Sequence, residues 1–510
     1  MDQQAHKVWQ SLHEDAATMS PKRYNAQHAA GKKTVRERLA MLLDAHSFEE
    51  IDQFVTPLSN DLKLYTDGVI TGFGTIHGRR VAIYAQDFTI KGGSLGKKHA
   101  EKICKVMDMA AKIGCPIIGL IDSGGARIDE GIHALSGYGS IFMRNIRYSG
   151  VVPQISVILG PCAGGAAYSP ALTDFIIMTK DISQLFITGP QVIEQVTNQV
   201  ITKEELGGWE VHSSKSGLAH LIANSEQEAF YTLKKLLTYL PQNYLETTRR
   251  IDKIDVQEDF ALLAAQLPDN PNQTYDMRNI IFGVIDQNSY CELQPNFAMN
   301  IITAFARIDG HAVGIVANQP LIKAGTIDID ASTKAARFIQ TCNNFGLPIV
   351  SLVDVPGYLP GIEQEHNGII RHGAKLLYAY AQATVPKITI IIRKAFGGAY
   401  IVMGSKELGA DFNYAWPTAQ IAVLGARAAV TIMQAKYLTT LQSSDRITKQ
   451  LELEQAYEAT FLNPYMAAEH GYIDGIIDPN KTRDHIIKAL EITAEKVEHL
   501  PRKKQGNCPL

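Results

Sequence analysis

The chain repeats itself, and this internal similarity constrains its fold more than any other feature. Pro116, Asp122 and Gly125, in the segment GCPIIGLIDSGG, each recur 232 positions later in GLPIVSLVDVPG. Upstream, ITGFGTIHGRRVAI recurs as ITAFARIDGHAVGI at the same spacing, and downstream VVPQISVILGPCAGGAAY recurs as TVPKITIIIRKAFGGAYI at a spacing of 233. So regular a spacing predicts two copies of one fold, which we place at residues 1–254 and 255–510.

Each copy has the pattern of an α/β fold, in which strands and helices alternate. RRVAIYAQDF and HAVGIVANQP are short β-branched runs typical of strands. PIIGLID and PIVSLVD are continuous apolar runs of the kind found in buried parallel strands. HAEKICKVMDMAAKIG has helical periodicity and a stop at Gly114. We further expect a helical leader up to about residue 50, a seam between Pro241 and Asn279, and a long helical tail from about Thr439.

The bulk composition excludes several classes of protein. The net charge of −3 offers no basic field for nucleic acid. The six cysteines are scattered, with no C-x-x-C pair, so we predict neither a zinc ribbon nor a disulfide framework, and a reducing, cytoplasmic location. No apolar run reaches about 18 residues, the length expected of a membrane-spanning helix.

Both copies place a glycine pair between a β-rich run and a predicted helix: Gly164–Gly165 and Gly397–Gly398. Glycine lets the backbone approach a ligand closely, and the unpaired amides of a helix start favour a developing negative oxygen. The candidate oxyanion donors are the amides near Gly164 and Gly165 in the first copy and near Gly398 and Ala399 in the second. The same glycines could instead serve only to pack a helix tightly on a strand, and spacing alone leaves both interpretations open.

Two other glycine-rich segments, KGGSLGKKHAEK and DSGGARIDEG, combine glycines with basic side chains and could contact a phosphate-bearing ligand. Neither matches a Walker A loop or a dinucleotide fingerprint, and a solvated surface turn is the simpler interpretation of Lys97 and Lys98. Ser123 lies in D-S-G-G and not in the G-x-S-x-G of a hydrolase, and no histidine has metal-ligand spacing. An enzyme with two oxyanion sites and no evident protein base suits chemistry in which a cofactor supplies the base.

The motifs AQDFTIKGGSLG, DSGGARIDEG, GPCAGGAAYSPALTDF, VDVPGYLPG, RKAFGGAY and NYAWPTAQIAVLGA occur in this order along nearly the whole chain. Together they resemble the β subunit of propionyl-CoA carboxylase and related biotin-dependent acyl-CoA carboxyltransferases. The resemblance implies two tandem crotonase-like domains, with an acyl-CoA on the first and biotin on the second. It also implies a reaction that moves a carboxyl group between carboxybiotin and the α-carbon of the acyl-CoA.

The resemblance also implies which residues do this work. Amides at Gly164 and Gly165 would hold the thioester enolate, and those at Gly398 and Ala399 would hold the biotin oxyanion. The residues implied to contact the acyl-CoA or biotin are Gly93, Ser94, Gly124, Gly125, Ala126, Pro356, Gly357, Gly397 and Ile401. Propionyl-specific relatives often carry Asp at the position of Ile401, so acetyl-CoA or a mixed acyl range remains open.

The partners follow from what the sequence lacks. There is no A-M-K-M biotinylation motif and no biotin carboxylase segment, so we expect biotin carboxylase and a biotin carboxyl carrier on other chains. The resemblance further implies a homo-hexamer whose sites lie between the first domain of one chain and the second domain of its neighbour. It implies no metal.

Three other functions remain open from the sequence. The α subunit of a methylmalonyl-CoA decarboxylase linked to a sodium pump would run the same chemistry in reverse and has nearly identical motifs. A hydratase or isomerase of the crotonase type would need a pair of glutamates beside the first oxyanion site, and we find no such pair in the sequence. A scaffold subunit would have no use for glycine pairs in both copies.

Overall fold

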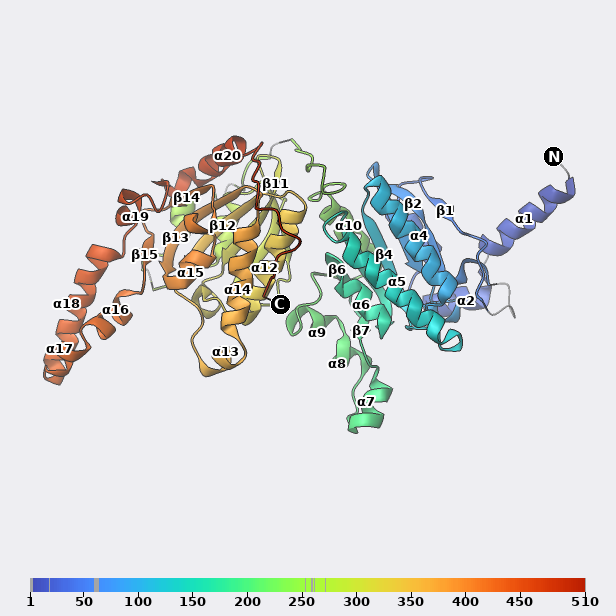
Figure 1. Cartoon of the computed structure of the whole chain (residues 1–510), viewed down its shortest axis with the longest axis horizontal. Helices are drawn as coiled ribbons and strands as arrows, with labels where there is room; N and C mark the ends of the chain where they lie inside the picture. Colours follow the sequence, from blue (N-terminus) through green and yellow to red (C-terminus); the bar gives the residue numbers. More distant parts are fainter. Residues whose placement is uncertain are drawn as a thin grey trace. The chain divides into compact units, whose positions relative to one another are not determined.

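The computed structural model describes residues 3–17, 19–58, 64–252, 254–257, 260, 262–270 and 272–509. Its contacts divide the chain into two compact units, Met1–Thr247 and Thr248–Leu510 (Figure 1). The division falls inside the seam predicted between Pro241 and Asn279. Each unit has its own sheet and core.

The first unit is built on a mixed sheet with the order β1-β2-β3-β4-β5-β6-β8, and β7 pairs with β5 off this path. The pairs β1–β2 and β2–β3 are antiparallel, whereas the pairs from β3 to β8 are parallel. The strands are β1 (Glu49–Ile51), β2 (Val69–Ile76), β3 (Arg79–Gln86), β4 (Ile117–Ser123), β5 (Gln154–Ala163), β6 (Phe175–Thr179), β7 (Gln184–Phe186) and β8 (Leu221–Ala223).

The second unit repeats this arrangement in the order β16-β14-β13-β12-β11-β10-β9, with β15 paired to β13. Here too the pairs β9–β10 and β10–β11 are antiparallel, whereas the pairs from β11 to β16 are parallel. The strands are β9 (Cys291–Leu293), β10 (Ile301–Ile308), β11 (His311–Asn318), β12 (Ile349–Val355), β13 (Lys387–Phe396), β14 (Phe412–Ala415), β15 (Gln420–Ala422) and β16 (Gly475–Ile476). The strands predicted at RRVAIYAQDF, HAVGIVANQP, PIIGLID and PIVSLVD are therefore confirmed as β3, β11, β4 and β12.

Paired helices lie across one face of each sheet (Figure 1). In the first unit these are α4 (Lys97–Ile113) and α5 (Ile132–Tyr148), and in the second α12 (Ile329–Asn344) and α14 (Ile369–Gln382). Helix α4 ends at Gly114, as its sequence predicts, because this residue adopts a φ of 66° that favours glycine. Short helices follow β5 and β13: α6 (Gly165–Ala171) and α15 (Gly397–Val402).

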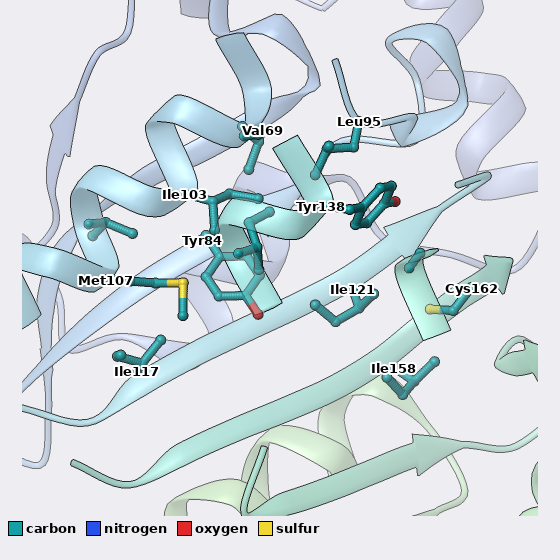
Figure 2. Packing of buried hydrophobic residues seen from close by; sticks show 14 of the residues in the cluster. Val69, Tyr84, Leu95, Ile103, Met107, Ile117, Ile121, Tyr138, Ile158 and Cys162 are labelled. Carbon is teal, nitrogen blue, oxygen red and sulfur yellow. The ribbon is translucent and has the colours of Figure 1, made fainter. Parts of the chain in front are cut away.

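The core of the first unit lies between α4, α5 and the sheet (Figure 2). Helix α4 packs on β2 and β3 and against α5, and the ring of Tyr138 comes from α5. The residues labelled in Figure 2 are all at most 4% exposed: Val69, Tyr84, Leu95, Ile103, Met107, Ile117, Ile121, Tyr138, Ile158 and Cys162. Continuous burial of β4 explains why its sequence begins with the apolar run 117–121; the last two residues, Asp122 and Ser123, are polar and also buried.

A buried lysine holds the loop before the second strand of each repeat. Lys102 donates to the carbonyl oxygens of Thr66 (3.0 Å) and Val69 (2.6 Å). Lys334, 232 positions later, donates to those of Phe297 (2.8 Å) and Ile301 (2.9 Å). Burial lowers the pKa of Lys102 to about 8 and that of Lys334 to about 7. The duplication has thus kept an interior contact as well as the fold.

The leader forms helices before β1, whereas the tail combines helices with a short strand. The leader contains α1 (Gln3–Ala17), α2 (Pro21–Ala29) and α3 (Val35–Leu42), and a capping box between Thr34 and Glu37 starts α3. The tail after Thr439 contains α18 (Ser443–Phe461), α19 (Tyr465–Glu469) and α20 (Thr482–Ile492), but also the strand β16. The prediction of a helical tail was therefore wrong at Gly475–Ile476. These two residues form a strand because they pair with β14.

We expect acid to destabilise the first unit through His99. This side chain is fully buried, its Nδ1 lies 3.0 Å from the carbonyl oxygen of Asp67, and its Nε2 faces the Gln86 amide at 3.3 Å. Burial, with the nearby charges of Arg127 and Lys102, lowers the pKa of His99 to about 3. Because the unfolded chain binds the proton near pH 6.5, the contribution of a neutral His99 to stability is lost progressively as the pH falls from about 6.5 to 3.

Unfolding midpoints of the wild type and of His99→Gln, measured between neutral pH and pH about 4, test this expectation. Glutamine keeps a donor and an acceptor but does not titrate, so the variant should lose less stability on acidification. The second unit has Ala331 at the equivalent position and provides an internal reference. An equal pH dependence of the two proteins would contradict the role given to His99.

Candidate functional site

In the first unit, the loop after β4 lies against the start of α6. At the ends of the neighbouring strands β4 and β5, Ser123 pairs with Cys162. Gly125 has a φ of +101°, and a Cβ on it would lie 2.8 Å from the carbonyl oxygen of Ala163. Only glycine allows this approach. The segments 124–126 and 163–165 are therefore neighbours.

The free amides at this junction come from the loop after β4 and from the start of α6. Gly125 O accepts from Leu95 N (2.9 Å) and Arg127 N donates to Leu95 O (3.0 Å), so the N–H of the intervening Ala126 points to the other side. On the helix, Gly165 and Ala166 belong to the first turn, whose amides have no intrahelical acceptor. In the described part of the chain, neither Ala126 N nor Gly165 N has a backbone acceptor outside its own element.

The amide of Gly164 is already engaged, since it donates to the carbonyl oxygen of Phe186 on β7 at 3.0 Å. Of the two candidate donors inferred from the sequence, Gly164 and Gly165, Gly165 is the one whose amide has no acceptor of this kind among the described residues. Its position matches Gly398 at the spacing of 233. A Cβ on Gly165 would lie 2.8 Å from the ring of Tyr138, so glycine is required there for packing as well.

Hydrogen bonds hold the loop after β4 in one conformation. The Ser123 hydroxyl donates to Gly93 O (2.7 Å) and accepts from Gly125 N (3.2 Å). Gly124 N donates to Gly92 O at 2.9 Å. A Cβ on Gly93, whose φ is +62°, would lie 2.1 Å from the carbonyl oxygen of Asp122. The predicted segments around Gly93–Ser94 and Gly124–Ala126 thus pack directly on one another.

The second unit builds the same junction. Ile327 N donates to Gly357 O (3.1 Å), and Leu359 N donates to Ile327 O (2.8 Å), which leaves the amide of Tyr358 facing away from Ile327. Tyr358 stands 232 positions after Ala126. Gly397 has the same φ, +58°, as Gly164, and Gly398 and Ala399 lie in the first turn of α15. Tyr358 was missed from the sequence, although the repeat spacing alone identifies it.

A mostly apolar cavity of about 340 Å³ opens beside the start of α15. Gly398 lines it, and no atom lies within 4 Å of the position of a Cβ on this residue. Ile401, 41% exposed, also lines the cavity. The remaining lining residues are Tyr358, Glu365, Ile369, Ile370, Gly373, Ala374, Leu377 and Val402. The amide of Gly398 therefore stands at the edge of a space large enough for a small bicyclic ring.

Two of the basic residues of the glycine-rich segments, Arg127 and Lys98, have structural partners. Arg127 is buried and pairs with Asp67 (2.6 Å) and Glu130 (2.7 Å). Lys98 is half-exposed and pairs with Glu101 one turn further along α4. These contacts leave Arg127 with no role as a phosphate ligand. The described residues contain no group of three or more His, Cys, Asp or Glu suited to a metal, and no helix among them is long and apolar enough to cross a membrane.

Comparison with known proteins matches residues 26–508 to the carboxyl transferase domain. The chain is 51% identical to the propionyl-CoA carboxylase beta chain of Saccharopolyspora erythraea, over 99% of this chain and 95% of that protein. It is 52% identical to the methylmalonyl-CoA decarboxylase subunit alpha of Propionigenium modestum, over 96% of this chain and 95% of that one.

Among solved structures, the chain resembles a transcarboxylase 12S crystallised with methylmalonyl-coenzyme A and methylmalonic acid. The TM-score is 0.95 at 46% identity, and the match covers 100% of this chain and 98% of the other. This likeness confirms the predicted α/β fold with two crotonase-like repeats. Together with the matched domain, it also confirms the predicted enzyme class. The chain belongs to the carboxyl transferase domain family, as the order of its glycine-rich motifs indicated.

Proposed function

We propose that this chain is the carboxyltransferase subunit of a biotin-dependent acyl-CoA carboxylase, which moves a carboxyl group between carboxybiotin and the α-carbon of propionyl-CoA or acetyl-CoA. The observation that carries the proposal is the repeated junction of a loop amide and a helix-start amide, Ala126 with Gly165 and Tyr358 with Gly398. Two such junctions suit a reaction in which two different carbonyl oxygens gain negative charge.

The first unit would act on the acyl-CoA. Abstraction of the α-proton puts negative charge on the thioester oxygen, and the amides of Ala126 and Gly165 would donate to it. Because the Ser123 and Gly93 contacts already hold the loop, little reorganisation is needed when the charge develops. Gly93, Ser94, Gly124 and Gly125 support this loop, and Gly164 shapes the turn before α6.

The second unit would receive biotin, which reaches the site on a carrier chain and supplies the carboxyl group and the base. The cavity beside α15 fits a small apolar bicyclic group, with Gly398 at its edge and Tyr358 in its wall. The amides of Tyr358, Gly398 and Ala399 would donate to the ureido oxygen. Pro356, Gly357 and Gly397 set the backbone around them.

The partners belong to the same proposal. Biotin carboxylase and a biotin carboxyl carrier, separate or fused, would supply the carboxylated cofactor in the cytoplasm. The transcarboxylase 12S that this chain resembles is described as a hexamer assembly, and we propose a homo-hexamer here. In it, each reaction site would combine the first domain of one chain with the second domain of its neighbour.

The acyl preference should depend on Ile401, which lines the cavity beside α15 proposed for biotin, since the biotin ring and the acyl chain must meet there for the carboxyl group to move. We expect Ile401→Asp to shift the ratio of kcat/KM for propionyl-CoA over acetyl-CoA toward propionyl-CoA, because the propionyl-specific enzymes that this chain resembles often carry Asp at this position. The size should be about tenfold, the usual effect of one methylene on discrimination between substrates. Ile401→Val, which keeps the pocket apolar, is the matched control and should change the ratio little. An unchanged ratio in Ile401→Asp would remove this residue from substrate selection.

The deciding experiment for the function is carboxyl exchange. Purified chain is incubated with free biotin and malonyl-CoA or methylmalonyl-CoA labelled in the carboxyl group, and label on biotin is measured. Transfer supports the proposal and ranks the two substrates. Absence of transfer from folded oligomer, with a biotinylated carrier protein also supplied, would overturn it.

A second candidate is the α subunit of a methylmalonyl-CoA decarboxylase. The 52% identities to such subunits of Propionigenium modestum and Veillonella parvula favour it as strongly as the carboxylase relatives favour the first. The two differ in direction and partner and not in the reaction site. Co-purification from the native cell separates them: a soluble biotin carboxylase identifies the carboxylase, and a membrane-bound carboxybiotin decarboxylase identifies the decarboxylase.

A further inference from the structure

Both repeats bury one carboxylate at the same point, just before the loop that leads to the free amide. Asp122 on β4 and Asp354 on β12 are 232 positions apart and at most 1% exposed. The backbone N–H of each donates at 3.3 Å to a side-chain amide on the preceding strand, Gln86 or Asn318. The duplication has therefore retained a buried negative charge beneath each junction.

The two repeats neutralise this charge differently. In the second, Arg393 on the adjacent strand β13 donates its Nε to Asp354 at 3.0 Å, and Lys394 N donates to the other oxygen at 3.0 Å. The first repeat has Gly160 at the position equivalent to Arg393. A Cβ on Gly160 would lie 1.9 Å from Asp122 Oδ1, so no side chain at this position of β5 can take the place of Arg393.

The first repeat takes its cations from the leader instead. Lys32 Nζ lies 2.7 and 2.8 Å from the two oxygens of Asp122, and Arg38 Nη1 lies 2.9 Å from Oδ2. Arg38 also binds both oxygens of Glu226, on α10 (Glu226–Leu237), and donates to Leu159 O at 2.9 Å. All four charged side chains are less than a tenth exposed.

Movement of Asp122 would be passed directly to the loop. Its carbonyl oxygen packs on Gly93, and the next residue, Ser123, bonds to both Gly93 O and Gly125 N. Removing Arg38 would take away one of the two cations that contact the buried Asp122 carboxylate. The end of β4 would then have to shift, or water would have to enter, to satisfy this carboxylate. The amide of Ala126 lies four residues beyond Asp122 on this same strand end and loop.

We propose that Lys32 and Arg38 are positioning residues: the leader segment 32–38 supplies the cations that the first repeat lacks, and thereby holds the loop that carries the Ala126 amide in its working position. The inference rests on the proposed function for the role of that amide in the reaction. The leader is then part of the acyl-CoA half of the enzyme, although it lies outside the repeat.

The test combines hydrogen exchange with kinetics on the full-length oligomer. In Arg38→Met, amide exchange measured by mass spectrometry should rise in peptides covering 120–127 and stay unchanged in those covering 352–359. Arg393→Met should give the opposite pattern. Carboxyl transfer by Arg38→Met, per folded chain, should fall in kcat by about 10²-fold, the typical effect of misplacing a reacting group by about 1 Å, with the KM for biotin unchanged.

Matched variants separate positioning from stability. Arg144→Met removes an ion pair to Asp108 between α5 and α4 in the same unit and should leave both the exchange in 120–127 and kcat unchanged. If Arg38→Met does not accumulate as folded protein, Arg38→Lys decides the matter. Lysine keeps the positive charge, but its single nitrogen cannot reproduce the three contacts that Nε, Nη1 and Nη2 of Arg38 make with Glu226 and Asp122. Arg38→Lys should therefore show the same changes as Arg38→Met, but smaller ones.

The outcomes are distinct. Unchanged exchange in 120–127 in a folded Arg38 variant would overturn the positioning role. Raised exchange with unchanged kcat per folded chain would overturn its link to the reaction. Failure of the wild type to transfer carboxyl would reject the proposed function alone, because the exchange result does not depend on it.

Discussion

Asp122→Asn is expected to lower the free energy of unfolding of the first unit by about 3–5 kcal/mol, the usual cost of leaving buried charges without their counter-charge. Lys32 and Arg38 are 6% and 1% exposed and both contact the Asp122 carboxylate within 2.9 Å. Hydrogen bonds to Glu226 and the charge of Asp122 outweigh burial and raise the pKa of Arg38, so this cation keeps its proton. Asparagine has nearly the same shape, which makes charge the variable tested.

Urea denaturation near neutral pH measures this loss. Asp108→Asn is the control, because Asp108 forms a partly exposed ion pair with Arg144 in the same unit, and we expect its loss to cost less than about 1 kcal/mol. Arg38→Met combined with Asp122→Asn should cost less than the sum of the two single changes, since the residues form one network. A loss of less than about 1 kcal/mol in Asp122→Asn would show that water or a local shift compensates the cations.

Gly398→Pro is expected to lower kcat for carboxyl transfer by about 10²–10³-fold, the usual effect of deleting one oxyanion donor. Proline removes the backbone N–H, and the first turn of a helix tolerates it because no intrahelical bond is lost there. Outside the helix's own backbone, no atom lies within 4 Å of the position of a Cβ on Gly398, so there is room for this carbon of the ring.

Gly398→Ala is the matched control for the proline variant. It adds the Cβ that proline also has and keeps the amide, so an effect of this carbon atom on the cavity appears in both variants. Comparing the two in kcat and in KM for biotin isolates the N–H. Equal kcat values in the alanine and proline variants would show that the Gly398 amide makes no contribution in the transition state.

Much of the architecture was visible in local patterns. The runs PIIGLID and PIVSLVD became the fully buried strands β4 and β12, and the periodic segment before Gly114 became α4. The repeat spacing also located the two junctions, because duplicated segments of one fold place equivalent residues at equivalent points. These features can be predicted because the side of a helix or strand that is buried determines where apolar residues recur along the sequence.

Other features depend on residues far apart in the chain. No local pattern shows that Phe186, on a three-residue strand, accepts from Gly164 and so shifts the candidate donor to Gly165. Likewise, the strand β16 in the tail exists because it pairs with β14, some sixty residues earlier. Short strands carry too little sequence pattern to be identified before their partners are known.

The order of the residues alone establishes that the chain is a duplicated α/β protein, where its glycine junctions lie, and that its motifs are those of a carboxyltransferase. Two features became visible only in the folded chain: which amide at the first junction is free, and that the leader supplies the counter-charges of Asp122, 84 and 90 positions away. The physical reason is that the conformation of a residue depends largely on its neighbours in sequence, whereas the partner of a buried charge or amide is set by the packing of the whole unit.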